Sequence, residues 1–454
     1  MSKPVLAWAA WDCGSAAWNA VVTTFVFTVY LTSSSFGGKN ETSTTLGAGL
    51  TIAGVLVALL APVIGRRADR AGRGKRWLAV HTVVVVAMTA ALFFVRPTPS
   101  MLWFGVGALA VGTLFFEFAS VNYNALLTSI STPSTIGRVS GLGWGAGYLG
   151  GIVLLLILLL GFIQPDVGLF GVTDQDGMNI RVAMLVSAAW FALFALPVFR
   201  SVPERATITV SGTSGASGQV RARGLSGLVA AYRELWETLS DLARHHRTTL
   251  YFLGASAVFR DGMVGIFTFG GVIAAGTFGF STSSVIMFGL VANVVAGVAT
   301  IVGGYLDDRL GPKRIIVGSL VCMIVAGVGI FLAHDRGPGL FWVLGLLLTV
   351  FVGPVQSAAR SLLARALPPG REGEIFGLYA TTGRAVSFLA PLAFSVSIGI
   401  GVAVLPDGAE AQHWGILGIV AVLLVGLLLV LPVSPPHGYS ARDTDRLGCG
   451  ADQA

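Results

Sequence analysis

Long apolar stretches alternate with short polar ones along the whole chain, and the apolar stretches run for 19 to 30 residues. A helix needs about 20 apolar residues to cross roughly 30 Å of hydrocarbon, whereas strands of a membrane barrel alternate in polarity over about ten residues. The pattern therefore predicts an all-α membrane protein with twelve spans. These are expected at residues 5–31, 44–65, 77–95, 101–130, 138–163, 180–199, 248–277, 284–304, 315–333, 339–366, 374–401 and 411–432.

Composition agrees with this class and excludes several others. Hydrophobic residues make up 54% of the chain, charged residues only 11%, and the mean hydropathy is +0.80, which excludes a soluble globular protein. The three cysteines, Cys13, Cys322 and Cys449, have no metal-ligand spacing. The "GAGYLG" at 145–150 has the glycine spacing of a nucleotide loop but no strand before it. We expect no enzyme, cofactor or metal site, and we expect Gly143, Gly147 and Gly151 to serve close helix packing instead.

The distribution of positive charge predicts the orientation in the membrane. An even number of spans places both termini on one side, and 22 of the 29 lysines and arginines fall on that side. By the positive-inside rule, both termini are cytoplasmic in a multi-pass protein of the cell (inner) membrane. The net charge of +7 is then a topology signal and requires no nucleic acid.

Four regions are expected along the chain. Residues 1–199 and 248–432 each form a bundle of six helices, and residues 433–454 form a disordered cytoplasmic tail. Residues 200–247 are a cytoplasmic linker, which contains the flexible stretch "SGTSGASG". Later in this linker, hydrophobic residues recur at helical spacing, which predicts either an amphipathic helix on the membrane surface or a plain connection. These residues are Leu228, Tyr232, Leu235, Leu239 and Leu242.

The two halves repeat each other. The segment "GRRADRAGRGKR" (65–76) follows the second span and "GYLDDRLGPKR" (304–314) follows the eighth, so that Asp69 aligns with Asp308 and Arg70 with Arg309. A second pair of segments, 126–142 and 362–378, aligns at a shift of 236 residues. Two pseudo-symmetric halves of six helices are typical of secondary transporters, whose binding site lies between the halves near the middle of the membrane.

Both Gly-x-x-x-Asp-Arg-x-Gly segments resemble the cytoplasmic signature of the major facilitator superfamily. The "WD" at 11–12, "GRVSGLGWGAGYLGG" at 137–151 and "RSLLARALPPGREGEIFGLYATTGRAVSFLAP" at 360–391 are similar to the vacuolar effluxer-like branch of that superfamily. The resemblance implies the major facilitator fold, a cavity lined by spans one, four, seven and ten, and transport of amino acids.

Ionisable residues well inside the predicted spans are few, and none falls in the spans that the resemblance places outside. They are Asp12, Glu117, Arg260, Asp261, Arg360 and Arg384. At 100° per residue, polar residues also form one stripe on each of four spans, which predicts a water-accessible cavity. The stripes are Trp8, Asp12, Ser15, Asn19, Thr23 and Tyr30; Thr113, Glu117, Ser120, Asn124 and Thr128; Thr349, Gly353, Gln356 and Arg360; and Thr381, Arg384, Ser387, Pro391 and Ser395.

Two interpretations of these charges remain open. Three acids and three bases can neutralise one another in permanent ion pairs that only hold helices together. Alternatively, a carboxylate that loses and regains its partner can carry a proton, and a fixed arginine can bind a carboxylate of the solute. The predicted substrate and proton cavity comprises Asp12, Asn19, Glu117, Asn124, Arg260, Asp261, Gln356, Arg360 and Arg384. Asp12 is expected to carry a proton, to contact the substrate or to pair with Arg360 or Arg384. Arg260 and Asp261 are expected to have different partners.

The repeated cytoplasmic segments predict a gate. Asp69 and Asp308 are placed to cap the positive ends of the eleventh and fifth spans in the opposite half. We expect Asp308 to pair with Arg138, and Glu374 to pair with Arg70 or Arg73, when the cytoplasmic side is shut. The predicted gate residues are Asp69, Arg70, Arg73, Arg138, Asp308, Arg309 and Glu374. A purely topological role for these arginines is the alternative.

The sequence therefore predicts a monomeric secondary transporter in the lipid bilayer that moves a small polar solute, such as an amino acid, by alternating access with a coupling proton. Two alternatives remain: an efflux pump for amphipathic drugs or lipids, which Trp8, Trp18 and Trp144 near the stripes would favour, and a membrane receptor or scaffold without transport.

Overall fold

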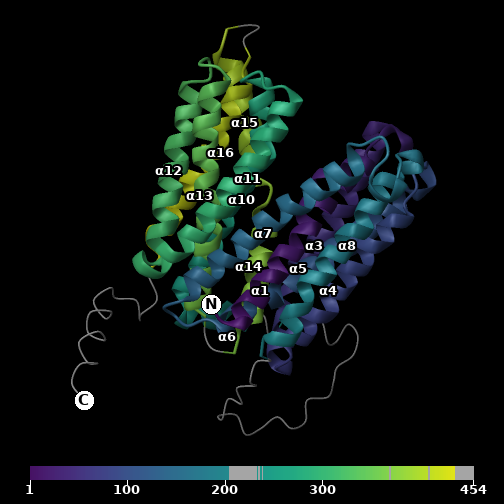
Figure 1. Ribbon diagram of the computed structural model, residues 1–454. Helices are drawn as coiled ribbons and strands as arrows, with labels where there is room; N and C mark the ends of the chain where they lie inside the picture. Colours follow the sequence, from purple (N-terminus) through teal and green to yellow (C-terminus); the bar gives the residue numbers. More distant parts are fainter. Residues whose placement is uncertain (204–232, 234–235, 238, 368–369, 407–409, 435–454) are drawn as a thin grey trace.

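A computed structural model describes residues 1–203, 233, 236–237, 239–367, 370–406 and 410–434. Within these residues it contains twelve helical stretches that are long and apolar enough to cross a membrane. The prediction of an all-α membrane protein with twelve spans is therefore confirmed. Figure 1 shows the helices in two bundles, one from each half of the chain.

The first bundle uses the segments before residue 204. Its helices are α1 (Lys3–Ala16), a π-helix (Ala17–Phe25), α2 (Phe27–Leu31), α3 (Lys39–Ala71), α4 (Gly74–Ala91), α5 (Leu102–Ala125), α6 (Leu127–Ile130), α7 (Ile136–Leu158), a π-helix (Leu159–Ile163) and α8 (Met178–Ser201). The second bundle comprises α10 (Arg247–Gly276), α11 (Thr282–Leu310), α12 (Pro312–Leu332), α13 (Pro338–Arg365), α14 (Glu372–Val386), α15 (Leu389–Val404) and α16 (Gly415–Val430).

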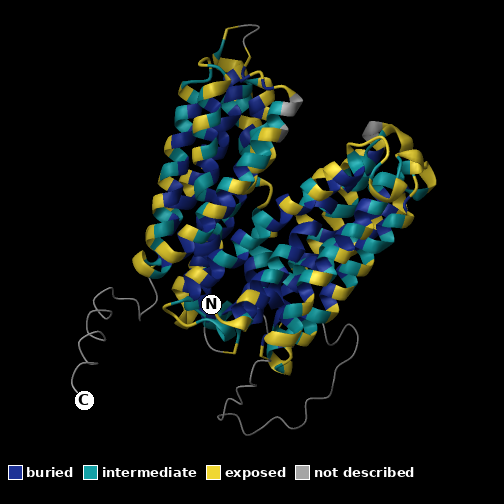
Figure 2. Ribbon diagram, viewed as in Figure 1, coloured by how far each residue is buried: buried dark blue, intermediate teal, exposed yellow. Residues whose placement is uncertain are grey.

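The two bundles meet at one end and diverge toward the other, so that the molecule has the outline of a V (Figure 1). The closed end is the one at which α8 ends and α10 begins, and we call it the linker end. The most extensive contacts between the bundles are α7 with α11 and α3 with α14. Buried residues gather where the bundles meet (Figure 2).

Backbone-to-backbone packing holds the linker end shut. A methyl group built on Gly141 of α7 would lie 2.7 Å from the carbonyl oxygen of Thr300, and one on Gly377 of α14 would lie 2.6 Å from that of Ala61. Only glycine permits such an approach. The opposite face of α7 packs on α1 through the three glycines predicted for this purpose, since Gly143 faces Trp8, Gly147 faces Asp12 and Gly151 faces Ala16.

The repeated segments after the second and eighth spans are helical and do not form the loops that the sequence led us to expect. Helix α3 continues to Ala71 and α11 to Leu310, and each ends at a glycine with positive φ: Gly72 at 58° and Gly311 at 88°. Glycine adopts this backbone conformation without a steric penalty, which ends each helix. Asp69 and Asp308 thus lie on last helical turns, which fixes their direction.

The eleventh span is broken, whereas we expected one helix over 374–401. Helix α14 ends at Val386 and α15 begins at Leu389. Pro391 has no N–H to continue the hydrogen-bond ladder, and the side chain of Asp261 accepts the N–H of Ala390 at 2.6 Å. The break therefore rests on a proline and on an acceptor from α10.

The first span also departs from a uniform helix, because residues 17–25 are π-helical. The hydroxyls of Thr23 and Thr24 both donate to the carbonyl of Asn19, at 3.0 and 2.6 Å. A helical wheel drawn at 100° per residue therefore does not predict which side chains share a face across these wider turns. Tyr30, which we placed on the cavity stripe, instead donates to the carbonyl of Val95 within the first bundle.

Most of the predicted linker and tail lies outside the described residues. This applies to Leu228, Tyr232 and Leu235 of the proposed amphipathic helix, and to nearly all of 433–454. Residues 239–245 are described and are helical. Leu242 is fully buried there and Leu239 packs against the core, so this end of the linker docks on the bundles.

Gly141→Ala tests the backbone packing at the linker end. The added methyl group would meet the Thr300 carbonyl, so we expect the two bundles to separate there and the melting temperature of the purified protein to fall by several degrees. Gly318→Ala in α12 is the matched control, because nothing lies within 4 Å of its added carbon. Equal melting temperatures for the two variants would contradict this account of the closed end.

Candidate functional site

Arg360 of α13 crosses from the second bundle into the first. Its Nε donates to the hydroxyl of Ser140 at 2.9 Å and its Nη2 to the carbonyl of the same residue at 2.6 Å. Its Nη1 donates to the side-chain oxygen of Asn124 at 3.2 Å and lies 3.7 Å from Oδ2 of Asp12. The residue is only 4% exposed, so it does not extend toward the membrane surface although it lies near a helix end. Of the two partners expected for Asp12, the structure provides Arg360.

Aromatic rings enclose this pair. The guanidinium carbon of Arg360 lies 4.8 Å from the ring of Trp8 and 5.7 Å from that of Trp144. The hydroxyl of Tyr123 donates to Oδ2 of Asp12 at 3.2 Å, and its ring stacks on Trp8 at 4.3 Å. A desolvated arginine gains from such ring faces as well as from its counter-ion. Asp12 and Arg360 therefore form a buried bridge between the bundles.

Glu117 of α5 and Arg384 of α14 form the second ion pair between the bundles, through Arg384 Nη2 and Glu117 Oε1. Unlike the first pair, it is partly open to solvent: the side chains are 23% and 39% exposed. Arg384 lies about two turns beyond Gly377, on the side of the closed contacts that is away from the linker end. The pair thus lies where the bundles begin to diverge.

Arg260 and Asp261 of α10 have different partners, as predicted. The guanidinium of Arg260 stacks on the ring of Tyr379 at 3.8 Å and donates to the carbonyl of that residue at 3.1 Å. Asp261 is 5% exposed and accepts the N–H of Ala390 at the start of α15. These two residues do not form an ion pair with each other.

Some of the remaining predicted cavity residues do not contact the charged residues described above. Asn19 is exposed on the π-helical part of the first span, and Gln356 is half-buried. Two members of the tenth-span stripe do not face the cavity: Thr349 is buried, and Gly353 packs against Thr300 of α11. That stripe marks helix packing over most of its length.

Both predicted helix caps are present at the linker end. Asp69 accepts the N–H groups of Gly373 and Glu374 at 3.0 and 2.9 Å. Asp308 accepts those of Gly137 and Arg138 at 2.7 and 3.0 Å. Each carboxylate lies at the positive N-terminal end of a helix of the opposite bundle. The predicted contact between Asp308 and Arg138 is also present, at 3.7 Å.

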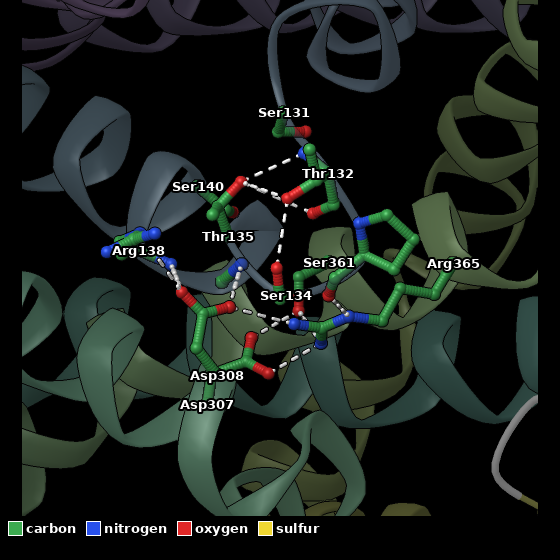
Figure 3. A network of polar contacts seen from close by, with 12 residues as sticks. Ser131, Thr132, Ser134, Thr135, Arg138, Ser140, Asp307, Asp308, Ser361 and Arg365 are labelled. Atoms are coloured by element: carbon green, nitrogen blue, oxygen red, sulfur yellow. Dashed lines mark hydrogen bonds and ion pairs between the residues drawn. The ribbon is translucent and has the colours of Figure 1, made fainter. Parts of the chain in front are cut away.

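Sequence reasoning missed three residues that complete the second cap, namely Asp307, Ser361 and Arg365. Arg365 donates to Asp307 at 2.6 Å and to Asp308 at 3.0 Å, and its Nε donates to the carbonyl of Pro133 in the opposite bundle at 3.2 Å. The hydroxyl of Ser361 donates to Asp307. Figure 3 shows the guanidinium of Arg365 between the two carboxylates, and both Asp307 and the Arg365 side chain are almost fully buried. The doubled acid at 307 and 308, where the first half has Ala68 and Asp69, was the available signal.

Glu374 is held by arginines outside the prediction. It lies 3.5 Å from Arg66 and 3.3 Å from Arg371, and Arg371 also pairs with Asp241 of the docked linker at 2.7 Å. In the part of the chain that the structure describes, Arg73 forms no ion pair, so the structure does not bring it to Glu374.

The other predicted gate arginines differ in their surroundings. Arg309 is exposed and forms no ion pair with any described residue. Arg70 lies on the last turn of α3, next to the cap residue Asp69. The structure therefore keeps Arg309 outside the gate, and a pairing of Arg70 with Glu374 remains a prediction.

Hydrogen bonds from Arg371 and then from His245 hold the pKa of Asp241 below its usual value. A carboxylate with a lowered pKa loses its stabilising contact only as the pH falls through that lowered value. Asp241 therefore stays ionised at neutral pH, and its ion pair with Arg371 at the start of α14 persists there.

Twelve helices in two bundles that close around paired charges define a transporter of the major facilitator class. A family model described as "Major Facilitator Superfamily" matches residues 1–155, and one described as "Vacuole effluxer Atg22 like" matches residues 129–440. The chain belongs to the Atg22-like vacuole effluxer family of the major facilitator superfamily. Members of this superfamily are transporters, and the chain is accordingly not an enzyme.

Relatives agree with this assignment. An uncharacterized MFS-type transporter, YxiO of Bacillus subtilis (strain 168), is 27% identical over 401 residues, which cover 87% of this chain and 88% of that protein. Autophagy-related protein 22 of Cryptococcus neoformans var. neoformans serotype D (strain B-3501A) is 24% identical over 314 residues, 66% of this chain and 52% of that protein. The matched region thus spans about half of that fungal relative's length.

Solved structures show the same fold. The proton:xylose symporter XylE superposes with a TM-score of 0.69 at 13% identity, with 98% of each chain covered. The transporter FucP in its outward conformation superposes with a TM-score of 0.66 at 14% identity, covering 96% of this chain and 99% of that one.

Arg365→Gln tests the buried cluster at the linker end. The change leaves Asp307 and Asp308 without their shared cation, and removal of one partner of a buried ion pair costs about 3–5 kcal/mol. We expect a melting temperature of the purified protein several degrees below the wild-type value. Arg309→Gln removes an exposed arginine from a neighbouring position and should leave the melting temperature unchanged. A wild-type melting temperature for Arg365→Gln would refute the structural role of the cluster.

Proposed function

We propose that this chain is a secondary active transporter of amino acids that works by alternating access and is coupled to protons. The observation that carries the proposal is the ion pair between Glu117 and Arg384, which joins the two bundles and is still reached by solvent. Family membership supports solute export, since the matching family model is described as that of a vacuole effluxer. Amino acids are the solute class that the sequence resemblance implies.

A zwitterion suits a site of this kind. Separating an ion pair inside a membrane is costly unless each charge receives a new partner. The ammonium group of an amino acid can pair with Glu117, and its carboxylate with an arginine of the second bundle. The solute thereby compensates for the separation of the bundles, which links its binding to the conformational change.

The position of the acids supports the proposed proton coupling. Asp12 meets Arg360 only while the linker end is closed, because the two residues belong to different bundles. Opening that end separates them, and a carboxylate left without its cation in an apolar setting binds a proton more readily. Glu117 is exposed to the same exchange of partners when Arg384 moves away.

The orientation proposed from the positive charges places the linker end in the cytoplasm of a cell with this protein in its plasma membrane. The V then opens outward, and the two capped contacts and the buried Arg360 form the cytoplasmic gate. A single chain contains both bundles and every residue of the site, so we propose that the monomer is the transporting unit.

Export of amphipathic drugs or lipids receives less support. Of the three aromatic residues that favoured it, Trp144 is half-buried. Trp8 and Trp18 are fully buried in the first bundle, where Trp8 stacks on Tyr123 and Trp18 fits against Gly112. Neither ring is available to a large apolar ligand in this conformation.

Transport in proteoliposomes tests the proposal, with a mixture of radiolabelled amino acids used first to find a substrate. In Glu117→Gln, we expect exchange of labelled for unlabelled solute to weaken, because the ammonium group loses its anionic partner. We expect the acceleration of the remaining exchange by a pH gradient to disappear, because the neutral side chain no longer takes up a proton. Asp335→Asn, a change in an exposed carboxylate outside the spans, is the control and should retain the acceleration.

The same measurement extends to the other two intramembrane acids, as Asp12→Asn and Asp261→Asn. If all three neutral variants respond to the pH gradient as the wild type does, proton coupling through these acids is wrong. If no amino acid is exchanged by the wild-type protein, the proposed solute class is wrong.

A further inference from the structure

Arg260 lies in the middle of a membrane span. It is the fourteenth residue of the 30-residue helix α10, which places it about 20 Å from either end at a rise of about 1.5 Å per residue. An arginine side chain cannot reach the membrane surface over that distance. The guanidinium is fixed in place by the ring of Tyr379 at 3.8 Å and by the carbonyl of Tyr379 at 3.1 Å.

The charges inside the spans do not balance pair by pair. Asp12 pairs with Arg360 and Glu117 with Arg384, which leaves Asp261 and Arg260. Asp261 is directed to the N–H of Ala390, where the positive end of α15 offsets its charge. Among the described residues no carboxylate lies within 4.0 Å of Arg260. Three acids and three bases are present, but one base has no anionic partner.

An uncompensated cation at this depth needs an anion. Arg260 is partly exposed, and one backbone carbonyl occupies only one of the five N–H donors of its guanidinium. A carboxylate fits the remaining donors as a bidentate partner. A transported solute that carries a carboxylate would supply such an anion.

Gly383 leaves one edge of the guanidinium clear. A methyl group built on Gly383 would lie 3.3 Å from Nη1 and 3.5 Å from Nη2 of Arg260. Gly383 also directly precedes Arg384, whose partner is Glu117. The two residues of α14 that lie next to Arg260 and Glu117 are therefore adjacent in the chain.

Arg181 shows which part of this arrangement is structural only. Its guanidinium also lies over a ring, that of Phe93 at 4.8 Å, and donates to the carbonyl of the same residue at 2.6 Å. However, Arg181 lies on the first turn of α8, close to the helix end, and it is buried. Depth in the membrane and access to solvent distinguish Arg260.

We propose that Arg260 binds the carboxylate of the transported amino acid, with Glu117 receiving its ammonium group. Arg384 is the less suitable partner for the carboxylate, because it already pairs with Oε1 of Glu117 while Oε2 of Glu117 is left for the ammonium group. This assignment rests on the proposed function, and it restricts the substrates to solutes that carry a carboxylate.

Binding to the purified full chain, measured by calorimetry, tests the assignment. The probes are leucine, its deaminated analogue 4-methylpentanoate and its decarboxylated analogue 3-methylbutylamine, with alanine, propionate and ethylamine as a smaller set. In Arg260→Gln, we expect affinity for the carboxylate-bearing probes to fall about tenfold to a hundredfold, the usual loss for a hydrogen-bonded charge, while the amines bind as before. Arg260→Lys should keep part of the affinity, because it keeps the charge and loses the planar fork.

Two further variants guard against a general loss of folding. Gly383→Ala keeps the charge and narrows access to the guanidinium, and it should weaken the carboxylate-bearing probes selectively. Arg181→Gln removes an arginine from a similar contact with a ring and a carbonyl, and should leave all affinities unchanged.

The outcomes separate the assignment from the proposed function. If wild type and Arg260→Gln bind the amino acids equally, the assignment is overturned and amino-acid transport stands. If chloride alone competes with the carboxylates at Arg260 with equal affinity, the site is one for inorganic anions and the assignment also fails. If the wild type binds none of the probes, both the amino-acid function and the assignment that rests on it are wrong.

Discussion

A charged side chain in the middle of a membrane requires a partner, and in this chain two of the three intramembrane arginines find theirs in the opposite bundle. Arg360 contacts Ser140, Asn124 and Asp12, and Arg384 contacts Glu117. These contacts exist only while the bundles are together on one side. The cost of burying the charges is therefore tied to the conformation, because separating the bundles at this end would remove these partners.

The two halves repeat each other in sequence, but the ion pairs around their two capping residues, Asp69 and Asp308, differ. Asp69 and Asp308 make the same pair of backbone hydrogen bonds, each to a helix of the other bundle. Around Asp308, the additional Asp307 and the buried Arg365 form a compact cluster. Around Asp69, the neighbouring acid Glu374 is held by arginines that solvent reaches, and one of these, Arg371, also holds the linker. The ion pair of Asp307 with Arg365 is thus more deeply buried than the ion pairs of Glu374 with Arg66 and Arg371, and salt screens the latter more effectively.

The sequence was sufficient for everything that depends on local pattern and internal repetition. Twelve spans follow from hydrophobic length, the two caps follow from the repeated Asp-Arg-x-Gly segments, and the packing glycines of α7 follow from their spacing. It was insufficient where the outcome depends on a partner far away in the chain. The break in the eleventh span depends on Asp261, which is 129 residues from Ala390. The polar stripe predicted on the tenth span packs against α11, because Gly353 allows Thr300 to approach closely.

The sequence was likewise insufficient to predict the partners of the charged residues. The sequence placed Asp12, Glu117, Arg260, Asp261, Arg360 and Arg384 in the spans, but their pairing is a property of three dimensions. Arg365 was overlooked because it lies near a helix end, where an arginine is ordinary and usually reaches the membrane surface. A π-helical first span could not be anticipated, because a fixed angle per residue underlies every prediction of which side chains share a face.

The glycine contacts of α7 and α3 have a consequence for the speed and sharpness of the transition. Main-chain atoms that touch directly have no rotatable groups between them, so this contact cannot loosen by degrees as an interface of long side chains can. Dispersion attraction declines steeply with distance, and a separation of about one ångström already forfeits much of it. The contact at the linker end should therefore behave as a switch with two positions, in which partly opened forms are sparsely populated and leak of solute between the two sides of the membrane is suppressed.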